Sequence, residues 1–273
     1  MGKEERKDLL IKYDAIVIGT GISGGWAAKE LCENGLKTLV LERGRMVRHV
    51  IDYPTMNKEN WDFDHRNLPR AEEAKRQEKQ ARTGYTTKKE WSHWFVDDIE
   101  HPYTETKRFD WMRGYHVGGR SLTWGRHSYR LGELDFMANK MDGHGVDWPI
   151  RYGDIAPWYD KVESYIGVSG KAIGNDQVPD GIFSEPMEFN CVEADLVERV
   201  AENMDGRVIT HARVAHITGD KLHEGRGKCQ FRDRCMRGCP FGGYFSSNAS
   251  TLPAAERTGN MTLRPNSIAC EIV

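Results

Sequence analysis

The chain has 273 residues, of which 38% are hydrophobic and 29% charged, and its formal net charge is -2 at pH 7. That length allows one large domain or two small ones. Lysines and arginines are scattered among acids, so no attraction to nucleic acid or to a membrane surface is expected. The N-terminal stretch lacks the apolar core of a signal peptide, and no run reaches membrane-spanning length. The composition therefore favours an ordinary soluble globular protein without a transmembrane segment.

The first chemical signal is a glycine-rich turn between an apolar strand and a helix. The run YDAIVIG from Tyr13 predicts a buried parallel strand, and GTGISGG follows it in GxGxxG spacing. A helix is predicted over residues 23–34. Such a turn brings a pyrophosphate close to backbone N–H groups at the positive end of the helix dipole. The expected phosphate loop consists of Gly19, Thr20, Gly21, Ile22, Ser23 and Gly24.

A second apolar strand, predicted over residues 37–41, ends at Glu42 and Arg43. A carboxylate at the end of this strand, roughly 20 residues after the glycines, is placed to bind the ribose hydroxyls of an adenosine. A dinucleotide site is predicted from this combination of two strands, a glycine-rich turn, a helix and an acidic residue. The plain alternative is a glycine-rich turn without a ligand, and the motif alone does not separate FAD from NAD.

The apolar pattern disappears over residues 49–108, which we interpret as a long excursion between strands with a mixed-charge helix in RAEEAKRQEKQA. A second glycine-rich stretch, VGGRSLTWG, follows. Its residues Gly118, Gly119, Ser121 and Thr123 leave room for the backbone to approach a flat cofactor or its phosphates. A bulge or turn without a ligand would explain the same residues. Beyond it, the periodicity predicts a helix over 192–204, a strand over 207–218 and a final strand near the C-terminus.

Three cysteines, Cys229, Cys235 and Cys239, are spaced C-x5-C-x3-C, and a proline follows the last. Three thiolates from one loop can hold a [3Fe-4S] cluster. A zinc site would need a fourth ligand, for which His223 is the nearest candidate. The third interpretation is that the cysteines are free.

Together these motifs resemble those of the glucose-methanol-choline (GMC) oxidoreductases, in the branch of bacterial FAD-dependent glucose, gluconate and glycoside dehydrogenase catalytic subunits. In family order they are YDAIVIGTGISGGWAAKEL with LVLERG, VGGRSLTWG, WPIRYGDIAPWYDKVE and CMRGCPFGG. The resemblance implies an α/β fold, a Rossmann-like FAD-binding domain of the p-hydroxybenzoate-hydroxylase-like type with part of a substrate domain. It assigns residues 1–48, 109–135 and 205–273 to the incomplete FAD-binding domain, 49–108 to an insertion and 136–204 to a partial substrate or cap region.

The resemblance also implies FAD as the cofactor, bound without a covalent link because Thr123 stands where pyranose oxidases carry a flavin-bonded histidine. The adenosine ribose is expected on Glu42, next to Arg43, and a backbone contact to adenine near Ile268. Arg120 departs from the family pattern, because many members have a small residue there. The residues expected to line the isoalloxazine are Gly118, Gly119, Ser121, Thr123, Trp124 and Gly125.

For the complete enzyme, the resemblance implies that a histidine takes the hydroxyl proton of a sugar or polyol while hydride passes to the flavin. The family's histidine pair is expected beyond Val273, so no catalytic residue is assigned in this sequence. A [3Fe-4S] cluster beside the flavin favours a dehydrogenase with a cytochrome or quinone-linked acceptor and a small helper subunit. Such a helper could carry an export signal, which leaves both a cytoplasmic and a periplasmic location open.

Two rival functions remain at this point. The chain could be a truncated, non-catalytic FAD-binding or electron-transfer half that needs a C-terminal catalytic segment from elsewhere. It could also be an NAD-linked reductase with a structural zinc, which a flavin spectrum would exclude.

Overall fold

The computed structural model describes residues 12–84, 88–220, 223 and 225–272. Within them the chain divides into two compact units. The first comprises residues up to Trp124, Arg232–Pro240 and the residues from Ser246 onward, and the second comprises Gly125–Phe231 and Phe241–Phe245. The prediction about a signal peptide falls mostly on residues 1–11, which lie outside the described part. No described helix is long and apolar enough to cross a membrane.

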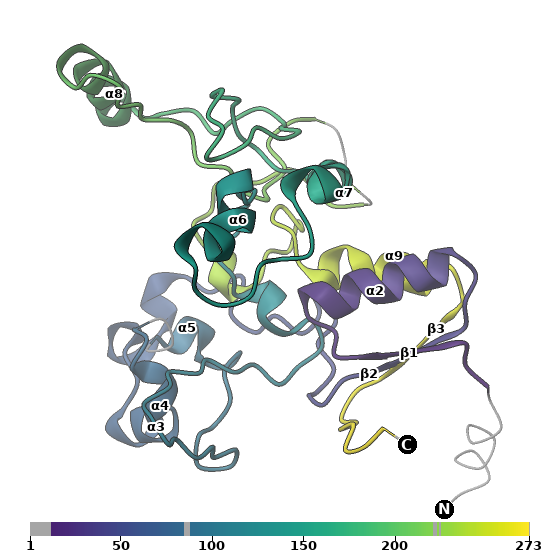
Figure 1. The fold of residues 1–273 in the computed structure, drawn as a ribbon. Helices are drawn as coiled ribbons and strands as arrows, with labels where there is room; N and C mark the ends of the chain where they lie inside the picture. Colours follow the sequence, from purple (N-terminus) through teal and green to yellow (C-terminus); the bar gives the residue numbers. More distant parts are fainter. Residues whose placement is uncertain (1–11, 85–87, 221–222, 224, 273) are drawn as a thin grey trace, which may run out of the picture. The chain divides into compact units, whose positions relative to one another are not determined.

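The first unit contains a parallel three-stranded sheet in the order β1 (Ala15–Ile18), β2 (Thr38–Leu41) and β3 (Met261–Arg264). Helices α2 (Ile22–Glu33) and α9 (Thr251–Arg257) lie side by side along one face of this sheet (Figure 1). The predicted α/β fold with a Rossmann-like strand–helix–strand unit is confirmed. The core between the helices and the sheet consists of Val17, Ala28, Cys32, Val40 and Ala255.

The local sequence explains the β1–α2–β2 unit. Gly35 follows α2 with φ +83°, a left-handed conformation that ends helices readily when no Cβ is present. The N–H groups of Gly35 and Leu36 then donate to carbonyls of the last helical turn, 3.0 Å and 3.1 Å away. The predicted helix over 23–34 and strand over 37–41 are thus confirmed within one residue at each end.

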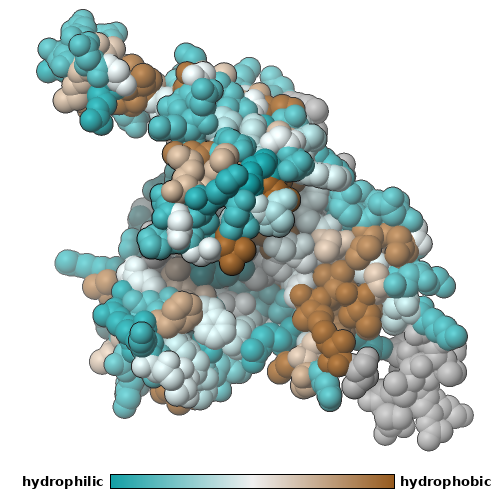
Figure 2. Space-filling model, in the orientation of Figure 1, coloured by the Kyte–Doolittle hydropathy of each residue, from teal (hydrophilic) through white to brown (hydrophobic). Residues whose placement is uncertain are grey.

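β1 is a parallel strand as predicted, but only one of its faces is buried. Ile16 is 62% and Ile18 is 58% exposed, because α2 and α9 cover only the face of the sheet that Val17 occupies. Figure 2 shows a broad apolar area over the strands on the uncovered side. β1 is therefore a half-buried strand in the described part of the chain.

Residues 49–108 belong to the first unit and form short helices joined by long loops. The predicted mixed-charge helix is split in two, because Gln77 leaves the helical conformation at φ -125°. A second core of Val47, Tyr53, Trp94, Phe95 and Leu122 holds this region together. The helices of this region are η1 (Asn60–Asp62), η2 (Asp64–Asn67), α3 (Ala71–Arg76), α4 (Glu78–Ala81) and α5 (Lys89–Ser92). A further short helix, η3 (Gly119–Leu122), carries part of the second glycine motif.

The second unit is built on α6 (Glu133–Asp142), α7 (Tyr152–Ile166) and α8 (Cys191–Asn203). The predicted helix over 192–204 is confirmed as α8. The predicted strand over 207–218 is wrong: this segment makes only isolated bridges, at Val214 and His216. Its alternating pattern does not follow burial, since Val208 is 76% exposed.

The structure groups the chain differently from the domain boundaries expected at the sequence level. Residues 49–108 share a unit with the sheet, and residues 205–231 lie in the second unit with 136–204. The last predicted strand is also shorter, because β3 ends at Arg264 and irregular backbone follows. The short helices η4 (Cys235–Arg237) and η5 (Ser247–Ala249) complete the first unit.

Candidate dinucleotide site

The predicted phosphate loop has the geometry of an open cradle at the start of α2. Gly19 has φ +92°, and a Cβ added to Gly19 or Gly21 would meet no atom within 4 Å. Gly24 differs, because its Cβ would lie 2.0 Å from the Gly19 carbonyl oxygen. Gly21 caps the helix without any side-chain hydrogen bond, which leaves first-turn N–H groups for a ligand. Two glycines thus keep space for a phosphate and the third allows the helix to pack closely.

Glu42 lies at the end of β2 with 6% of its surface exposed. Its Oε2 accepts hydrogen bonds from the Thr20 N–H (3.0 Å) and hydroxyl (2.5 Å), and its Oε1 accepts one from the Gly44 N–H (2.9 Å). These bonds fix the carboxylate beside the loop. A carboxylate offers about four lone-pair positions, so it keeps capacity to accept a ribose hydroxyl.

Thr20 joins the two glycine motifs, although they are about 100 residues apart in the sequence. Its hydroxyl accepts a hydrogen bond from the Gly118 N–H at 2.9 Å while it donates to Glu42. Next to it, a Cβ on Gly119 would lie 3.5 Å from the Gly21 Cα. The second glycine motif therefore packs directly on the phosphate loop.

Sequence reasoning missed Ser247 and Asn248, which hold both motifs in place. The Ser247 hydroxyl donates to the Gly21 carbonyl oxygen at 3.1 Å, and its N–H donates to the Ser121 hydroxyl at 3.0 Å. The Asn248 amide donates to the carbonyl oxygens of Val47 (2.8 Å) and Val117 (3.1 Å). In the sequence these two residues stand in SSNAS, a run of small polar residues that matches no motif with a defined spacing.

The hydroxyls predicted to face the cofactor are engaged within the chain. Ser121 is fully buried, and its hydroxyl donates to the Gly118 carbonyl oxygen at 2.6 Å. The Thr123 hydroxyl accepts a hydrogen bond from Arg120 Nε at 3.2 Å. What this motif offers a ligand is therefore mainly the backbone of Gly118 and Gly119 and the Arg120 side chain.

The remaining predicted contacts are spread over both units. Arg43 stacks on the Tyr115 ring at 3.8 Å. Ile268 is 61% exposed and lies beyond β3, where the Ser267 N–H donates to the Glu42 carbonyl oxygen at 2.8 Å. This bond brings the C-terminal segment beside the expected ribose position. Trp124 belongs to the first unit, and Gly125 belongs to the second.

His116 lies next to the second glycine motif and is buried. Its Nδ1 lies 3.1 Å from the Val117 carbonyl oxygen, and its ring lies 5.3 Å from that of Trp94. Burial lowers the pKa of His116 to about 4. It is therefore neutral at pH 7 and held in the core.

The cysteine motif is divided between the units. Cys229 belongs to the second unit, whereas Cys235 and Cys239 lie in the segment 232–240 of the first. The described residues contain no gathered group of three or more His, Cys, Asp or Glu side chains that could hold a metal.

The segment 232–240 is anchored through its side chains and backbone. Arg237 forms a buried ion pair with Glu90, and the Trp94 indole donates to the Met236 carbonyl oxygen at 2.8 Å. These contacts anchor the segment to the excursion region of the first unit.

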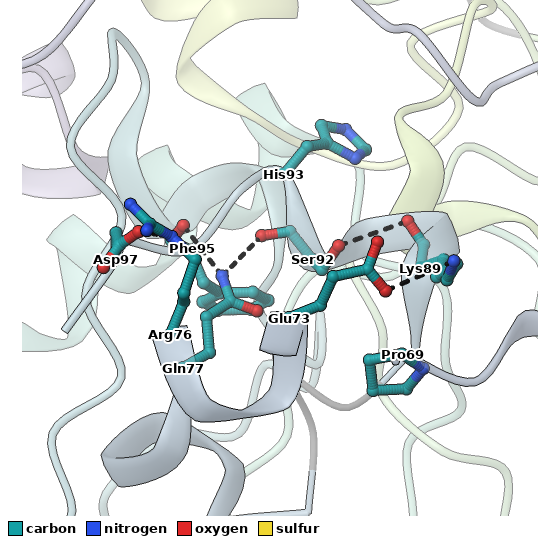
Figure 3. A pocket seen from close by; sticks show the side chains of 9 residues that line it. All are labelled: Pro69, Glu73, Arg76, Gln77, Lys89, Ser92, His93, Phe95 and Asp97. Atoms are coloured by element: carbon teal, nitrogen blue, oxygen red, sulfur yellow. Dashed lines mark hydrogen bonds and ion pairs between the residues drawn. The ribbon is translucent and has the colours of Figure 1, made fainter. Parts of the chain in front are cut away.

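A cavity of about 290 Å³ lies in the excursion region, away from the phosphate loop in sequence. Figure 3 shows that its charged side chains pair with one another, Glu73 with Lys89 and Arg76 with Asp97. Gln77 spans it, donating to the carbonyl oxygens of Ser92 (2.9 Å) and Phe95 (3.1 Å). The cavity offers little unmatched charge to a ligand, so the dinucleotide site remains the stronger candidate.

Comparison with known proteins finds relatives among dehydrogenases. No family model matches the chain. It is 26% identical over 271 residues to the fructose dehydrogenase large subunit of Gluconobacter japonicus, a match that covers 94% of this chain and 46% of that protein. It is 25% identical over 293 residues to the gluconate 2-dehydrogenase flavoprotein of Pantoea cypripedii, covering 96% of this chain and 45% of that protein.

The chain is therefore similar to GMC-type dehydrogenases. A third relative is the 2-methyl-1,2-propanediol dehydrogenase of Mycolicibacterium austroafricanum, 29% identical over 188 residues, which covers 63% of this chain and 28% of that protein. The solved structure of pyridoxine 4-oxidase from Mesorbium loti aligns with 15% identity and a TM-score of 0.45, over 93% of this chain and 42% of that one. The chain spans less than half the length of these curated relatives.

Proposed function

We propose that this chain binds FAD and forms part of a dehydrogenase that oxidises a CH–OH group of a sugar or related polyol. The observation that carries the proposal is the contact between the open phosphate loop and the Gly118 turn, fixed by Thr20 and Glu42. These residues fit a dinucleotide, because a Cβ at Gly21 would occupy space that is open in the structure. The names of the relatives, which include a fructose dehydrogenase and a gluconate 2-dehydrogenase flavoprotein, support the substrate class.

Each part of the chain has a defined task in this proposal. The first-turn N–H groups of α2 bind the pyrophosphate, and Glu42 accepts hydrogen bonds from the ribose. The Gly118 and Gly119 backbone orients the isoalloxazine side of the cofactor. FAD when bound supplies the hydride acceptor for the alcohol carbon. No side chain of this chain is proposed as the base that removes the hydroxyl proton.

The three cysteines are proposed to hold a [3Fe-4S] cluster that passes electrons to a cytochrome or quinone-linked acceptor, with a small helper subunit as partner. The C-x5-C-x3-C spacing and the proline after Cys239 support this part. The proposed alcohol oxidation does not depend on the cluster.

A second candidate is a non-catalytic FAD-binding or electron-transfer half. The observation that favours it is the coverage, because the chain spans 46% and 45% of two dehydrogenase relatives. One assay distinguishes the two candidate functions. If the chain is a non-catalytic half, the isolated chain would bind FAD but show no sugar turnover.

The test of the proposal is the absorption spectrum of chain purified without air, followed by heat or acid release of the chromophore. We expect flavin bands and FAD that is released intact, which indicates non-covalent binding. Metal analysis of the same sample tests the cluster, with about three irons per chain expected. Absence of flavin together with binding of NAD would contradict the proposal.

A further inference from the structure

Arg120 is a half-buried cation in the second glycine motif, and its protein partners are neutral. Its Nη1 donates to the Met112 carbonyl oxygen at 3.0 Å and its Nε to the Thr123 hydroxyl at 3.2 Å. No ion pair joins it to a carboxylate within the described part of the chain. Burial lowers the pKa of this guanidinium, and no acidic neighbour opposes that effect.

Other buried arginines of the first unit are neutralised. Arg113 pairs with Asp98 at 3.0 Å, and Arg237 pairs with Glu90. Taking a cation out of water without an anionic partner costs stability, so buried charges in proteins are ordinarily paired. The missing negative charge at Arg120 therefore points to a ligand.

The position of Arg120 indicates which ligand. It directly follows Gly119, whose added Cβ would lie 3.5 Å from the Gly21 Cα in the phosphate loop. The second glycine motif, which carries the Arg120 guanidinium, therefore packs on the loop that leads to the open N–H groups of α2. Both of these neighbouring segments carry a positive feature. Together they match a doubly charged pyrophosphate better than a neutral ring.

We propose that Arg120 is the protein's counter-charge to the FAD pyrophosphate. This inference rests on the proposed function, because it takes FAD as the ligand. Before the cofactor binds, the unpaired guanidinium destabilises the chain. After binding, it pairs with a phosphate oxygen, so the same residue contributes to affinity and makes folding dependent on the cofactor.

The test compares Arg120→Gln and Arg120→Lys with wild type in equilibrium titrations of FAD and of ADP, which has the pyrophosphate but no flavin. We expect Arg120→Gln to weaken both ligands by about tenfold or more at low salt, and Arg120→Lys to retain part of the affinity. The flavin-free Arg120→Gln chain should melt at the same temperature as wild type or higher. Arg108→Gln, which removes an exposed guanidinium of the same unit, is the matched control and should change neither affinity.

Three results would overturn the inference. One is unchanged affinity of Arg120→Gln for both ligands. Another is weaker FAD binding with unchanged ADP binding, which would indicate that Arg120 contacts the flavin ring and not the pyrophosphate. The third is a flavin-free variant that melts well below wild type, which would make Arg120 a structural residue. If wild type binds neither ligand, the proposed function itself fails.

Discussion

At the scale of single residues, Thr20 decides how the two glycine motifs meet. Its buried hydroxyl is the acceptor for the Gly118 N–H and a donor to Glu42. A buried N–H without an acceptor costs far more than an average hydrogen bond contributes. One hydroxyl therefore links the phosphate loop to Glu42 and to the second glycine motif.

Replacing Thr20 by Val keeps the shape but removes this hydroxyl. We expect the free energy of unfolding to fall by about 1–3 kcal/mol, because the Gly118 N–H loses its acceptor. Urea denaturation measures the change. Thr38→Val is the matched control, since the Thr38 hydroxyl donates only to the Leu36 carbonyl oxygen at 3.0 Å, and its loss should cost less. An equal decrease in the free energy of unfolding for the two variants would contradict the role given to Thr20.

Gly118 is constrained both by its backbone and by its neighbour. It has φ +87°, and an added Cβ would lie 1.6 Å from Asn248 Oδ1. Gly118→Ala should destabilise the chain well beyond the cost of Gly35→Ala, which has φ +83° but open space around it. Thermal melting of the two variants checks this difference. Similar melting temperatures would show that the Asn248 side chain moves aside at little cost in stability.

At the scale of elements, the approach of α2 to α9 and η5 depends on Gly25. A Cβ there would lie 2.6 Å from the Thr251 hydroxyl oxygen and 2.8 Å from that of Ser247. Ser247 in turn binds the Gly21 carbonyl oxygen. Packing of the two helices therefore sets the position of the phosphate loop.

Gly25→Ala should push α2 away from α9 and lower the free energy of unfolding by about 1–3 kcal/mol, despite the higher helix propensity of alanine. Chemical denaturation gives the value. Gly153→Ala, in the first turn of α7 with no atom within 4 Å, should be neutral or stabilising. A Gly25→Ala chain as stable as wild type would mean that the helices are not tightly packed at this point.

The local signals of the first 44 residues were sufficient to predict β1, α2, β2 and the open phosphate loop, because glycine spacing and apolar periodicity act over a few residues. The contacts of Ser247 and Asn248 could not be predicted, because they join residues 126 to 226 positions apart in the sequence. The prediction of a strand over 207–218 was wrong for a related reason. A short alternating pattern becomes a strand only when a neighbouring strand pairs with it along its length.

At the scale of the whole molecule, buried neutral histidines make stability depend on pH. Burial lowers the pKa of His93, His116 and His216 to about 4 in each case, below the ordinary value of 6.5. Between pH 6.5 and pH 4 the unfolded chain binds protons that the folded chain does not. Stability is therefore fully present above pH 6.5 and falls on acidification through this window.

We expect a melting temperature that decreases steadily from pH 7 to pH 5, with His116 alone contributing about 2 kcal/mol of the loss at pH 5. His116→Asn should flatten this dependence, because asparagine does not titrate. Calorimetry of both proteins at several pH values measures the slope. A wild-type chain that becomes more stable on acidification would show that these histidines are charged in the folded state.

The central claim is the proposal that the phosphate loop of this chain holds FAD, and Gly21→Asp tests it most directly. An added Cβ at Gly21 meets no protein atom within 4 Å, and Asp favours a helix N-terminus, so we expect the fold to tolerate the substitution. The measurement is an equilibrium titration with FAD, with Gly153→Asp, at an open first-turn glycine of α7, as control. We predict that wild type and the control bind FAD and that Gly21→Asp loses binding while the flavin-free chain keeps its melting temperature. Equal FAD binding by Gly21→Asp would contradict the account.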